Sequence, residues 1–190
     1  ASDLNCNFLG YAKKKKEFGN ISYVCGNALG MDFANNNFDA VILGELIEHV
    51  AYPEELIKKT SACLKKNGIM VITTPNNHLF SGLLLDHHPK LFSNIDEKDR
   101  KELSKRQFGP AGSDHLFVFD IKSLINVIKE QGLKVLDAGY VNSCFINQFT
   151  YPFLRICPKS MLHFFNNVTT KIPYFNKKLC LGLYAIAKNG

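Results

Sequence analysis

Two acidic residues and a histidine at close spacing are the side chains of this chain best suited to chemistry. Glu45, Glu48 and His49 follow the apolar run Phe38–Leu43. In a helix, spacings of three and four residues would place these side chains on one face. At the carboxyl end of a buried strand, such a face lies where open α/β sheets bind ligands, and its histidine could accept a proton. The same pattern also suits an ordinary helix start, where the helix dipole favours acids and a backbone carbonyl satisfies the histidine.

Strands and helices alternate along the chain, and this alternation would position the cluster. Phe38–Leu43 and Ile69–Thr73 are nearly continuous apolar runs, typical of parallel strands buried on both faces. Together with the shorter elements, they predict an α/β fold with a mainly parallel sheet. The other expected strands are Ile21–Cys25, Leu133–Leu136 and Leu179–Ala187; the expected helices are Phe8–Phe18, Pro53 to the closing pair Asn67-Gly68, Asp96–Gln107, and the segment from the N-cap Asp120 to Gly132.

Two regions interrupt the alternation within what we expect to be a single domain, residues 1–190. Residues 77–114 form a long connection rich in His, Lys and Asp, and connections of this length usually act as lids or binding segments. Residues 145–178 mix aromatic side chains with Lys and three prolines. We interpret this second region as an irregular cover for the sheet, with a lipid-facing or substrate-facing surface as the alternative.

The composition excludes several classes of protein. The 190 residues are 46% hydrophobic and 21% charged, which excludes disorder and disulfide-stapled miniproteins. No apolar stretch reaches the roughly 18–20 residues that span a bilayer. The net charge of +6 is compatible with anionic partners without requiring one. The six cysteines contain no CxxC pair, so we interpret them as reduced thiols and predict a cytoplasmic location.

Three stretches, in this order, resemble the class I S-adenosylmethionine-dependent methyltransferases. The first is Ser2-Asp3-Leu4 with the helix that follows, and the second is Cys25-Gly26-Asn27-Ala28 with Met31-Asp32-Phe33. The third and most specific runs from FDAVILGELIEHV, starting at Phe38, to IMVITTPN, ending at Asn76. The resemblance implies a Rossmann-like, doubly wound fold and S-adenosylmethionine as the cofactor.

The resemblance also assigns residues to the cofactor. Asp3, at a strand end, would accept both ribose hydroxyls, a device that Rossmann folds also use. Asn27 stands where the family usually has an acid for the adenine amino group, and its side-chain carbonyl can still accept that hydrogen bond. The full set of expected cofactor-binding residues is Asp3, Leu4, Asn27, Ala28, Leu43, Gly44 and Glu45.

The E-x-x-E-H pattern with a later histidine resembles two subgroups, the ubiquinone-pathway O-methyltransferases and the small-RNA 3′-terminal 2′-O-methyltransferases. In the RNA enzymes such residues hold a divalent ion, which here implies the ligands Glu45, Glu48, His49 and His115. Two imidazoles favour Mn²⁺, Fe²⁺ or Co²⁺ over Mg²⁺. Without a metal, His49 or His115 would take the acceptor's proton as general base. We therefore expect His49, His115 and Glu48 to be the catalytic residues.

The acceptor stays open at this point. The net charge and the run Lys13–Lys16 would suit RNA, but no RNA-binding module is evident, so we do not expect a nucleic-acid partner. The aromatic segment 145–178 favours a small-molecule or lipid-linked hydroxyl and allows peripheral membrane contact. A non-catalytic, methyltransferase-like binding module is the alternative from another class.

One signature of the family is missing. The family's first strand and glycine-rich turn would precede Asp3, and they normally supply the centre of the sheet. Buried backbone groups left unpaired by their absence would each cost about 1–3 kcal/mol. We therefore expect an N-terminally truncated chain that lacks this strand and is inactive by itself.

Overall fold

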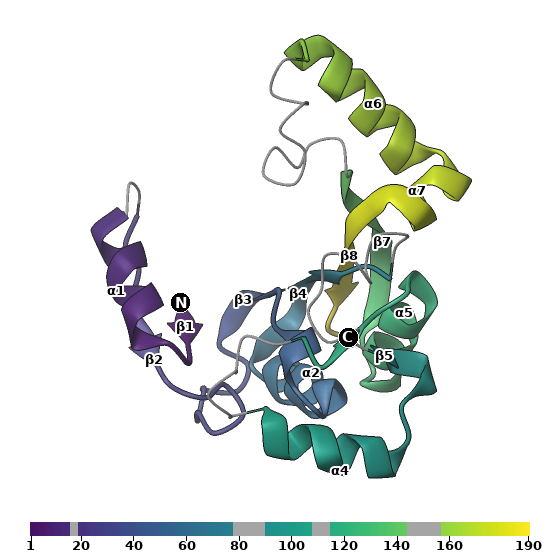
Figure 1. The fold of residues 1–190 in the computed structure, drawn as a ribbon. Helices are drawn as coiled ribbons and strands as arrows, with labels where there is room; N and C mark the ends of the chain where they lie inside the picture. Colours follow the sequence, from purple (N-terminus) through teal and green to yellow (C-terminus); the bar gives the residue numbers. More distant parts are fainter. Residues whose placement is uncertain (16–18, 78–89, 108–114, 144–156) are drawn as a thin grey trace.

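The computed structural model describes residues 1–15, 19–77, 90–107, 115–143 and 157–190. Within these ranges strands and helices alternate as the sequence predicts (Figure 1). Two short 3₁₀ helices, Ile47–His49 and Phe92–Asn94, lie between the longer elements. The strands are β1 (Ser2–Asp3), β2 (Val24–Cys25), β3 (Phe38–Gly44), β4 (Leu64–Pro75), β5 (Lys90–Leu91), β6 (Phe117–Val118), β7 (Lys134–Ser143) and β8 (Cys180–Lys188); the α-helices are α1 (Cys6–Lys15), α2 (Pro53–Ala62), α4 (Glu97–Arg106), α5 (Ile121–Glu130), α6 (Lys159–Lys171) and α7 (Pro173–Leu179).

The main sheet has four strands in the order β3-β4-β8-β7. β3 and β4 pair in parallel, whereas β8 pairs antiparallel with both β4 and β7. Three of the four strands therefore run in one direction, and only β8 runs against them. This arrangement confirms the predicted α/β fold and explains why the carboxyl ends of β3 and β4 meet at one edge of the sheet.

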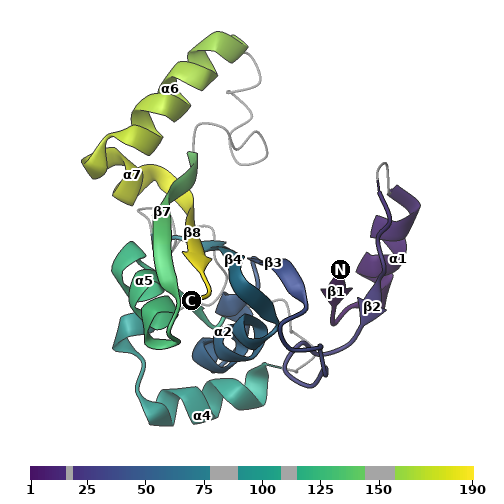
Figure 2. The same ribbon diagram turned by 180° about the vertical axis from the view of Figure 1, so that it is seen from behind.

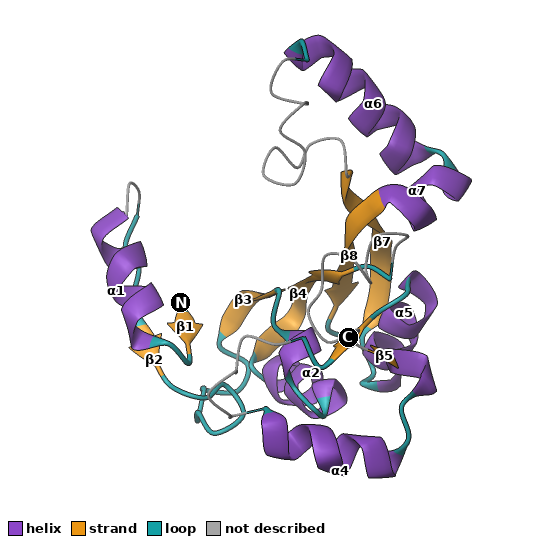
Figure 3. Cartoon of the chain, viewed as in Figure 1, coloured by secondary structure: helices purple, strands orange, loops and turns teal. Residues whose placement is uncertain are grey.

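Helices α2 and α5 pack together and also contact the main sheet, α2 on β4 and α5 on β7 and β8 (Figures 1 and 3). Their apolar sides meet the fully buried side chains of β4, Met70 and Ile72, in a continuous core. The expected N-cap of α5 is confirmed: Asp120 accepts from the backbone N–H of Ser123, and the Ser123 hydroxyl accepts from the N–H of Asp120. This capping box fixes where the helix begins.

The pair Asn67-Gly68 does not close a helix, and that prediction is wrong. Helix α2 ends at Ala62, and strand β4 already begins at Leu64. Asn67 has a φ of 66°, and a Cβ on Gly68 would lie 2.9 Å from the Lys65 carbonyl oxygen. The pair therefore forms an irregularity inside β4, where a left-handed residue and a close backbone approach favour Asn and Gly.

The unit β1-α1-β2 forms a small parallel sheet of its own, and Figure 2 shows it standing apart from the four-stranded sheet. Among the described strands, none pairs with the outer edge of β3, and the β3 side chain Ile42 is 72% exposed. In the described residues, the β1-β2 pair and the four-stranded sheet β3-β4-β8-β7 are therefore separate sheets.

The cysteines of this unit correct the prediction of reduced thiols throughout. Cys6 and Cys25 form a disulfide with their Cα atoms 5.2 Å apart. The parallel pairing of β1 with β2 brings the start of α1 to the end of β2, so residues 19 positions apart in sequence come within bonding distance. Among the described cysteines, Cys63, Cys157 and Cys180 are free thiols. The cysteine argument for a reducing compartment therefore fails at this pair.

The long connection 77–114 contains the predicted charged helix, now α4, with Asp96 as its N-cap. An ion pair between Arg100 and Glu54 attaches α4 to α2. Strand β5 pairs in parallel with β6 ahead of α5. Residues 78–89 and 108–114 of this connection lie outside the described residues.

The aromatic segment 145–178 contains helices α6 and α7, which contact each other and β7. Residues 144–156 lie outside the described part of the chain. None of the helices that the structure describes has the length and apolar character needed to cross a bilayer.

Candidate active site

The turn after β3 begins the site. Glu45 has a φ of 47°, and its backbone N–H donates to the Thr73 carbonyl oxygen at 3.0 Å. A 3₁₀ helix, Ile47–His49, follows in place of the α-helix that the sequence spacing suggested. Because the backbone turns sharply at Glu45, this exposed residue does not share a helix face with Glu48 and His49.

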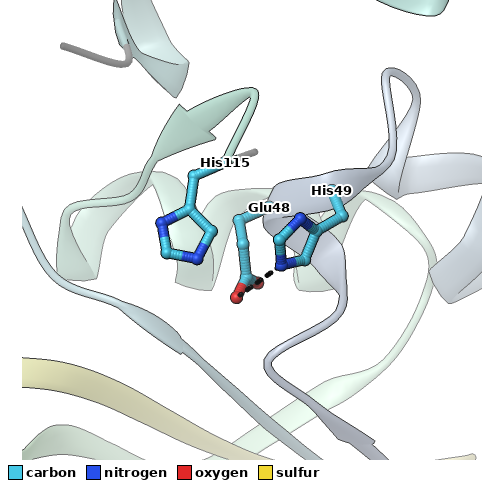
Figure 4. A group of neighbouring side chains, drawn as sticks. All are labelled: Glu48, His49 and His115. Atoms are coloured by element: carbon cyan, nitrogen blue, oxygen red, sulfur yellow. Dashed lines mark ion pairs between the residues drawn. The ribbon is translucent and has the colours of Figure 1, made fainter. Parts of the chain in front are cut away.

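His115 reaches the site from a segment far along the chain. The backbone N–H of Leu116 donates to the Glu48 carbonyl oxygen at 2.8 Å, which ties the approach to β6 directly onto the 3₁₀ helix. The imidazole rings of His49 and His115 lie with their centroids 4.8 Å apart. Figure 4 shows the Glu48 carboxylate beside the two rings, close to the ring of His49. The structure thus brings all three expected catalytic residues together.

Glu48 is the most unusual group of the site because its carboxyl is fully buried. Oε2 accepts from the Thr74 hydroxyl at 2.9 Å. Among the described residues, Oε1 has no hydrogen-bond partner, and it lies 3.9 Å from His49 Nε2. The pKa of Glu48 is raised from 4.5 to about 8, chiefly by burial, and the nearby charge of Glu45 contributes to this rise. At neutral pH, and without a bound cation, this carboxyl is therefore mostly protonated.

The donor atoms of Glu48, His49 and His115 all lie within 4.8 Å of one another. One carboxylate and two imidazoles suit Mn²⁺, Fe²⁺ or Co²⁺. The Oε1 atom without a hydrogen bond is the kind of buried group that a cation would satisfy. The residues present therefore fit a divalent metal. Glu45, the fourth ligand that the sequence suggested, lies outside this group.

The residues expected to bind the cofactor lie on two sets of loops. Asp3 ends β1, its Oδ1 accepts from the N–H of Asn5 at 2.7 Å, and its carbonyl oxygen accepts from the N–H of Gly26 at 2.9 Å. That second bond holds the loop after β1 against the loop that carries Asn27 and Ala28. The Oδ1 of Asn27 accepts from Leu29 N–H at 3.0 Å, so one lone pair of the proposed adenine acceptor is already used.

The second set of expected cofactor residues lies at the end of β3. Leu43 is buried in the core, whereas Gly44 and Glu45 are exposed at the carboxyl edge. Leu4 is also exposed, next to Asp3 on the first loop. In the described residues, no strand pairing joins β1 and β2 to β3.

Sequence reasoning missed Thr73 and Thr74, which lie near the end of β4, and Asn76, which follows it. The Thr73 hydroxyl accepts a hydrogen bond from the Glu45 backbone N–H, and the Thr74 hydroxyl donates one to the Glu48 carboxyl. Asn76 is 1% exposed, and its amide donates to the carbonyl oxygens of Lys177 and Cys180. The run of polar residues after an apolar strand, TTPN, was the available indication of these roles.

A family model described as a methyltransferase domain matches residues 11–138, which is more than half of the chain. The chain belongs to this methyltransferase family. A crystal structure of a SAM-dependent methyltransferase from Archaeoglobus fulgidus superposes with a TM-score of 0.59 at 16% identity, covering 99% of this chain and 74% of that one. This likeness confirms the Rossmann-like class I fold.

Two curated relatives match this methyltransferase over shorter stretches. The mitochondrial ubiquinone biosynthesis O-methyltransferase of Arabidopsis thaliana is 43% identical over 56 residues, which are 30% of this chain and 17% of the relative. The ubiquinone biosynthesis O-methyltransferase of Parvibaculum lavamentivorans is 37% identical over 59 residues, which are 31% of this chain and 23% of the relative. The matched stretch thus spans about a fifth of the length of these relatives.

Proposed function

We propose that this methyltransferase moves a methyl group from S-adenosylmethionine to a hydroxyl of a small-molecule or lipid-linked acceptor. The observation that carries the proposal is the group formed by Glu48, His49 and His115 at the carboxyl edge of β3 and β4. Open α/β sheets bind their ligands at this edge. The local sequence similarity to two ubiquinone biosynthesis O-methyltransferases supports oxygen as the methylated atom.

The N-terminal loops would hold the cofactor. The hydrogen bond from Asn5 uses only one carboxylate oxygen of Asp3, and a carboxylate accepts the two ribose hydroxyls more strongly than a neutral group would. The hydrogen bond between Gly26 and Asp3 fixes the distance between the ribose loop and the Asn27 loop. Methyl transfer is an in-line displacement, so this fixed geometry supplies most of the rate acceleration.

The three-residue group would act on the acceptor hydroxyl. His49 and His115 hold their rings next to each other and beside the Glu48 carboxyl, so without a metal an imidazole nitrogen can take the hydroxyl proton as the oxygen attacks the methyl group. The hydrogen bond from Thr74 holds the carboxyl in place, and burial excludes water around it. These residues would orient the acceptor and accept the proton of its hydroxyl.

The same group would bind a divalent metal, with Glu48, His49 and His115 as ligands. A metal bound there would lower the pKa of an acceptor hydroxyl. Glu48 must release its proton to become a ligand, so its raised pKa makes metal binding tighter as the pH rises toward about 8. Glu45 adds negative charge nearby without lying in the group.

Calorimetry and a methyl-transfer assay test the proposal on the full-length natural protein. We expect S-adenosylhomocysteine to bind, and labelled S-adenosylmethionine to methylate a phenolic acceptor carrying an isoprenoid tail. His115→Ala should lower turnover about 10²–10⁴-fold, the range for a lost general base, while the exposed His163→Ala on α6 should not. Binding without transfer to any hydroxyl acceptor would favour the non-catalytic module. Transfer to the terminal ribose of an RNA oligonucleotide alone would favour the RNA enzyme.

A further inference from the structure

Helices α6 and α7 expose aromatic and aliphatic side chains at one end of the molecule. Phe164 is 62% exposed and Tyr174 is 71% exposed. Met161 on α6, Phe175 on α7 and Ile172 between the two helices add further exposed apolar surface. Figures 1 and 2 both show this α6–α7 pair projecting beyond the ends of β7 and β8. A cluster of exposed apolar side chains is typical of an interaction surface.

The apolar side chains of α6 that are exposed or half-buried form one continuous sector. At about 100° per residue, Met161, Phe164, Phe165 and Val168 fall within an arc of about 100°. The buried residues Leu162 and Thr169 lie next to this arc, and the polar residues occupy the rest of the helix. The apolar face of α6 is therefore wider than the part that is buried in the described residues. An amphipathic helix of this kind lies in the plane of a lipid interface.

The charge of the region is of one sign. The sequence contains no Asp or Glu from Ala138 to its last residue, Gly190, a stretch that includes all of α6 and α7. The two helices carry four lysines: Lys159, Lys171, Lys177 and Lys178. All four side chains are exposed. An interface with a protein of mixed charge gives no reason for acidic residues to be completely absent. An anionic lipid surface does, because it attracts each lysine near it and repels acidic side chains.

The α6–α7 pair is also fastened to the edge of the sheet that carries the candidate site. The Asn76 amide donates to the Lys177 carbonyl oxygen at 3.2 Å and to the Cys180 carbonyl oxygen at 2.9 Å. Asn76 lies two residues beyond Thr74, which holds the Glu48 carboxyl. A bilayer that contacts α6 and α7 would thus lie at the side of the sheet where an acceptor enters.

We infer that α6 and α7 form a docking surface for an anionic bilayer, with the aromatic sector inserted at the headgroup level and the lysines facing the phosphates. We assign the lipid surface itself as the binding partner. Two features together support this choice: the exposed aromatic sector of α6, and a chain segment that carries lysines but no acidic residues. This docking needs no methyl transfer, so it goes beyond the proposed function. It would bring the enzyme to a lipid-linked acceptor.

Vesicle co-sedimentation tests the inference on the full-length natural protein. We expect binding to vesicles of phosphatidylcholine and phosphatidylglycerol in equal amounts, weaker binding to phosphatidylcholine alone, and loss of binding as salt is raised. The double variant Phe164→Ser/Tyr174→Ser should weaken binding about tenfold. Lys171→Ala should weaken it about fivefold, the effect of one lysine near an anionic surface.

The matched control is Phe8→Ser on α1, because Phe8 is 66% exposed and also lies on a lysine-bearing helix. The control should leave vesicle binding unchanged. Equal binding to both kinds of vesicle, or a loss in the control that matches the loss in the double variant, would overturn the inference. So would a lipid-free dimer that the double variant dissociates, because the partner would then be a second copy. Transfer to a water-soluble acceptor should be unchanged in the double variant, which separates docking from catalysis.

Discussion

Replacing Glu48 with Gln should change how the stability of the metal-free protein depends on pH. The pKa of Glu48 rises from 4.5 to about 8 on folding, chiefly because its carboxyl is buried. Between these values the unfolded chain has lost the proton and the folded chain still binds it. The free energy of unfolding therefore falls as the pH rises from about 4.5 to about 8, and the stabilising contribution present below 4.5 is lost.

The magnitude follows from about 1.36 kcal/mol for each unit of pKa difference. Between pH 5 and pH 7 the wild-type protein should lose about 2–3 kcal/mol through this group. Glu48→Gln cannot ionise and keeps an amide oxygen for the Thr74 hydroxyl, so the variant should gain that amount relative to the wild type over the same range. The chain has no Trp, so urea unfolding followed by circular dichroism, with a chelator present, is the suitable assay.

The control is Glu55→Gln, an exposed residue on α2 whose variant should follow the wild-type curve. Adding Mn²⁺ should stabilise the wild type, because the metal binds ionised Glu48, and should stabilise Glu48→Gln much less. If wild type and Glu48→Gln lose stability in parallel between pH 5 and pH 7, Glu48 is ionised in the metal-free fold. The burial argument would then be wrong.

Three further outcomes test other parts of the structure. Asp3→Asn should weaken S-adenosylhomocysteine binding about tenfold in calorimetry, because a charged acceptor is lost. The control Asp39→Asn, at an exposed position, should leave the affinity unchanged. If Asp3→Asn binds S-adenosylhomocysteine as tightly as the wild type, Asp3 is not part of the cofactor site. Asp120→Ala removes the capping box of α5 and should lower the free energy of unfolding by about 1 kcal/mol, and an unchanged urea midpoint would contradict that role. Reducing the disulfide between Cys6 and Cys25 removes a cross-link that stabilises the fold by about 3 kcal/mol through chain entropy. Amide hydrogen exchange in α1 should therefore accelerate. Unchanged exchange rates would show that the disulfide does not stabilise this unit.

Much of the fold was predictable because its main elements follow from local patterns. The apolar runs of β3 and β4 and the capping residues Asp96 and Asp120 each indicate one structure with little competition. The pair Asn67-Gly68 was misassigned because Asn-Gly suits both a helix end and an irregular strand. Pairing of Leu64 with Phe38, a long-range contact, decides for the strand.

The candidate site was predictable in part. Glu48 and His49 are neighbours in sequence, and the family resemblance singled out His115, which the structure places beside them. The left-handed backbone at Glu45 could not be anticipated, because that residue leaves the group through a turn fixed by Thr73 on the adjacent strand. The disulfide depends likewise on the pairing of β1 with β2, which no local spacing of cysteines reveals.

The most direct test of the central claim is a crystal structure of the full-length protein soaked with Mn²⁺ and S-adenosylhomocysteine, with anomalous differences measured at the manganese edge. We expect one strong anomalous peak bonded to Glu48, His49 and His115, and the nucleoside ribose on Asp3. A peak elsewhere, or a nucleoside bound away from the carboxyl edge of β3 and β4, would contradict it.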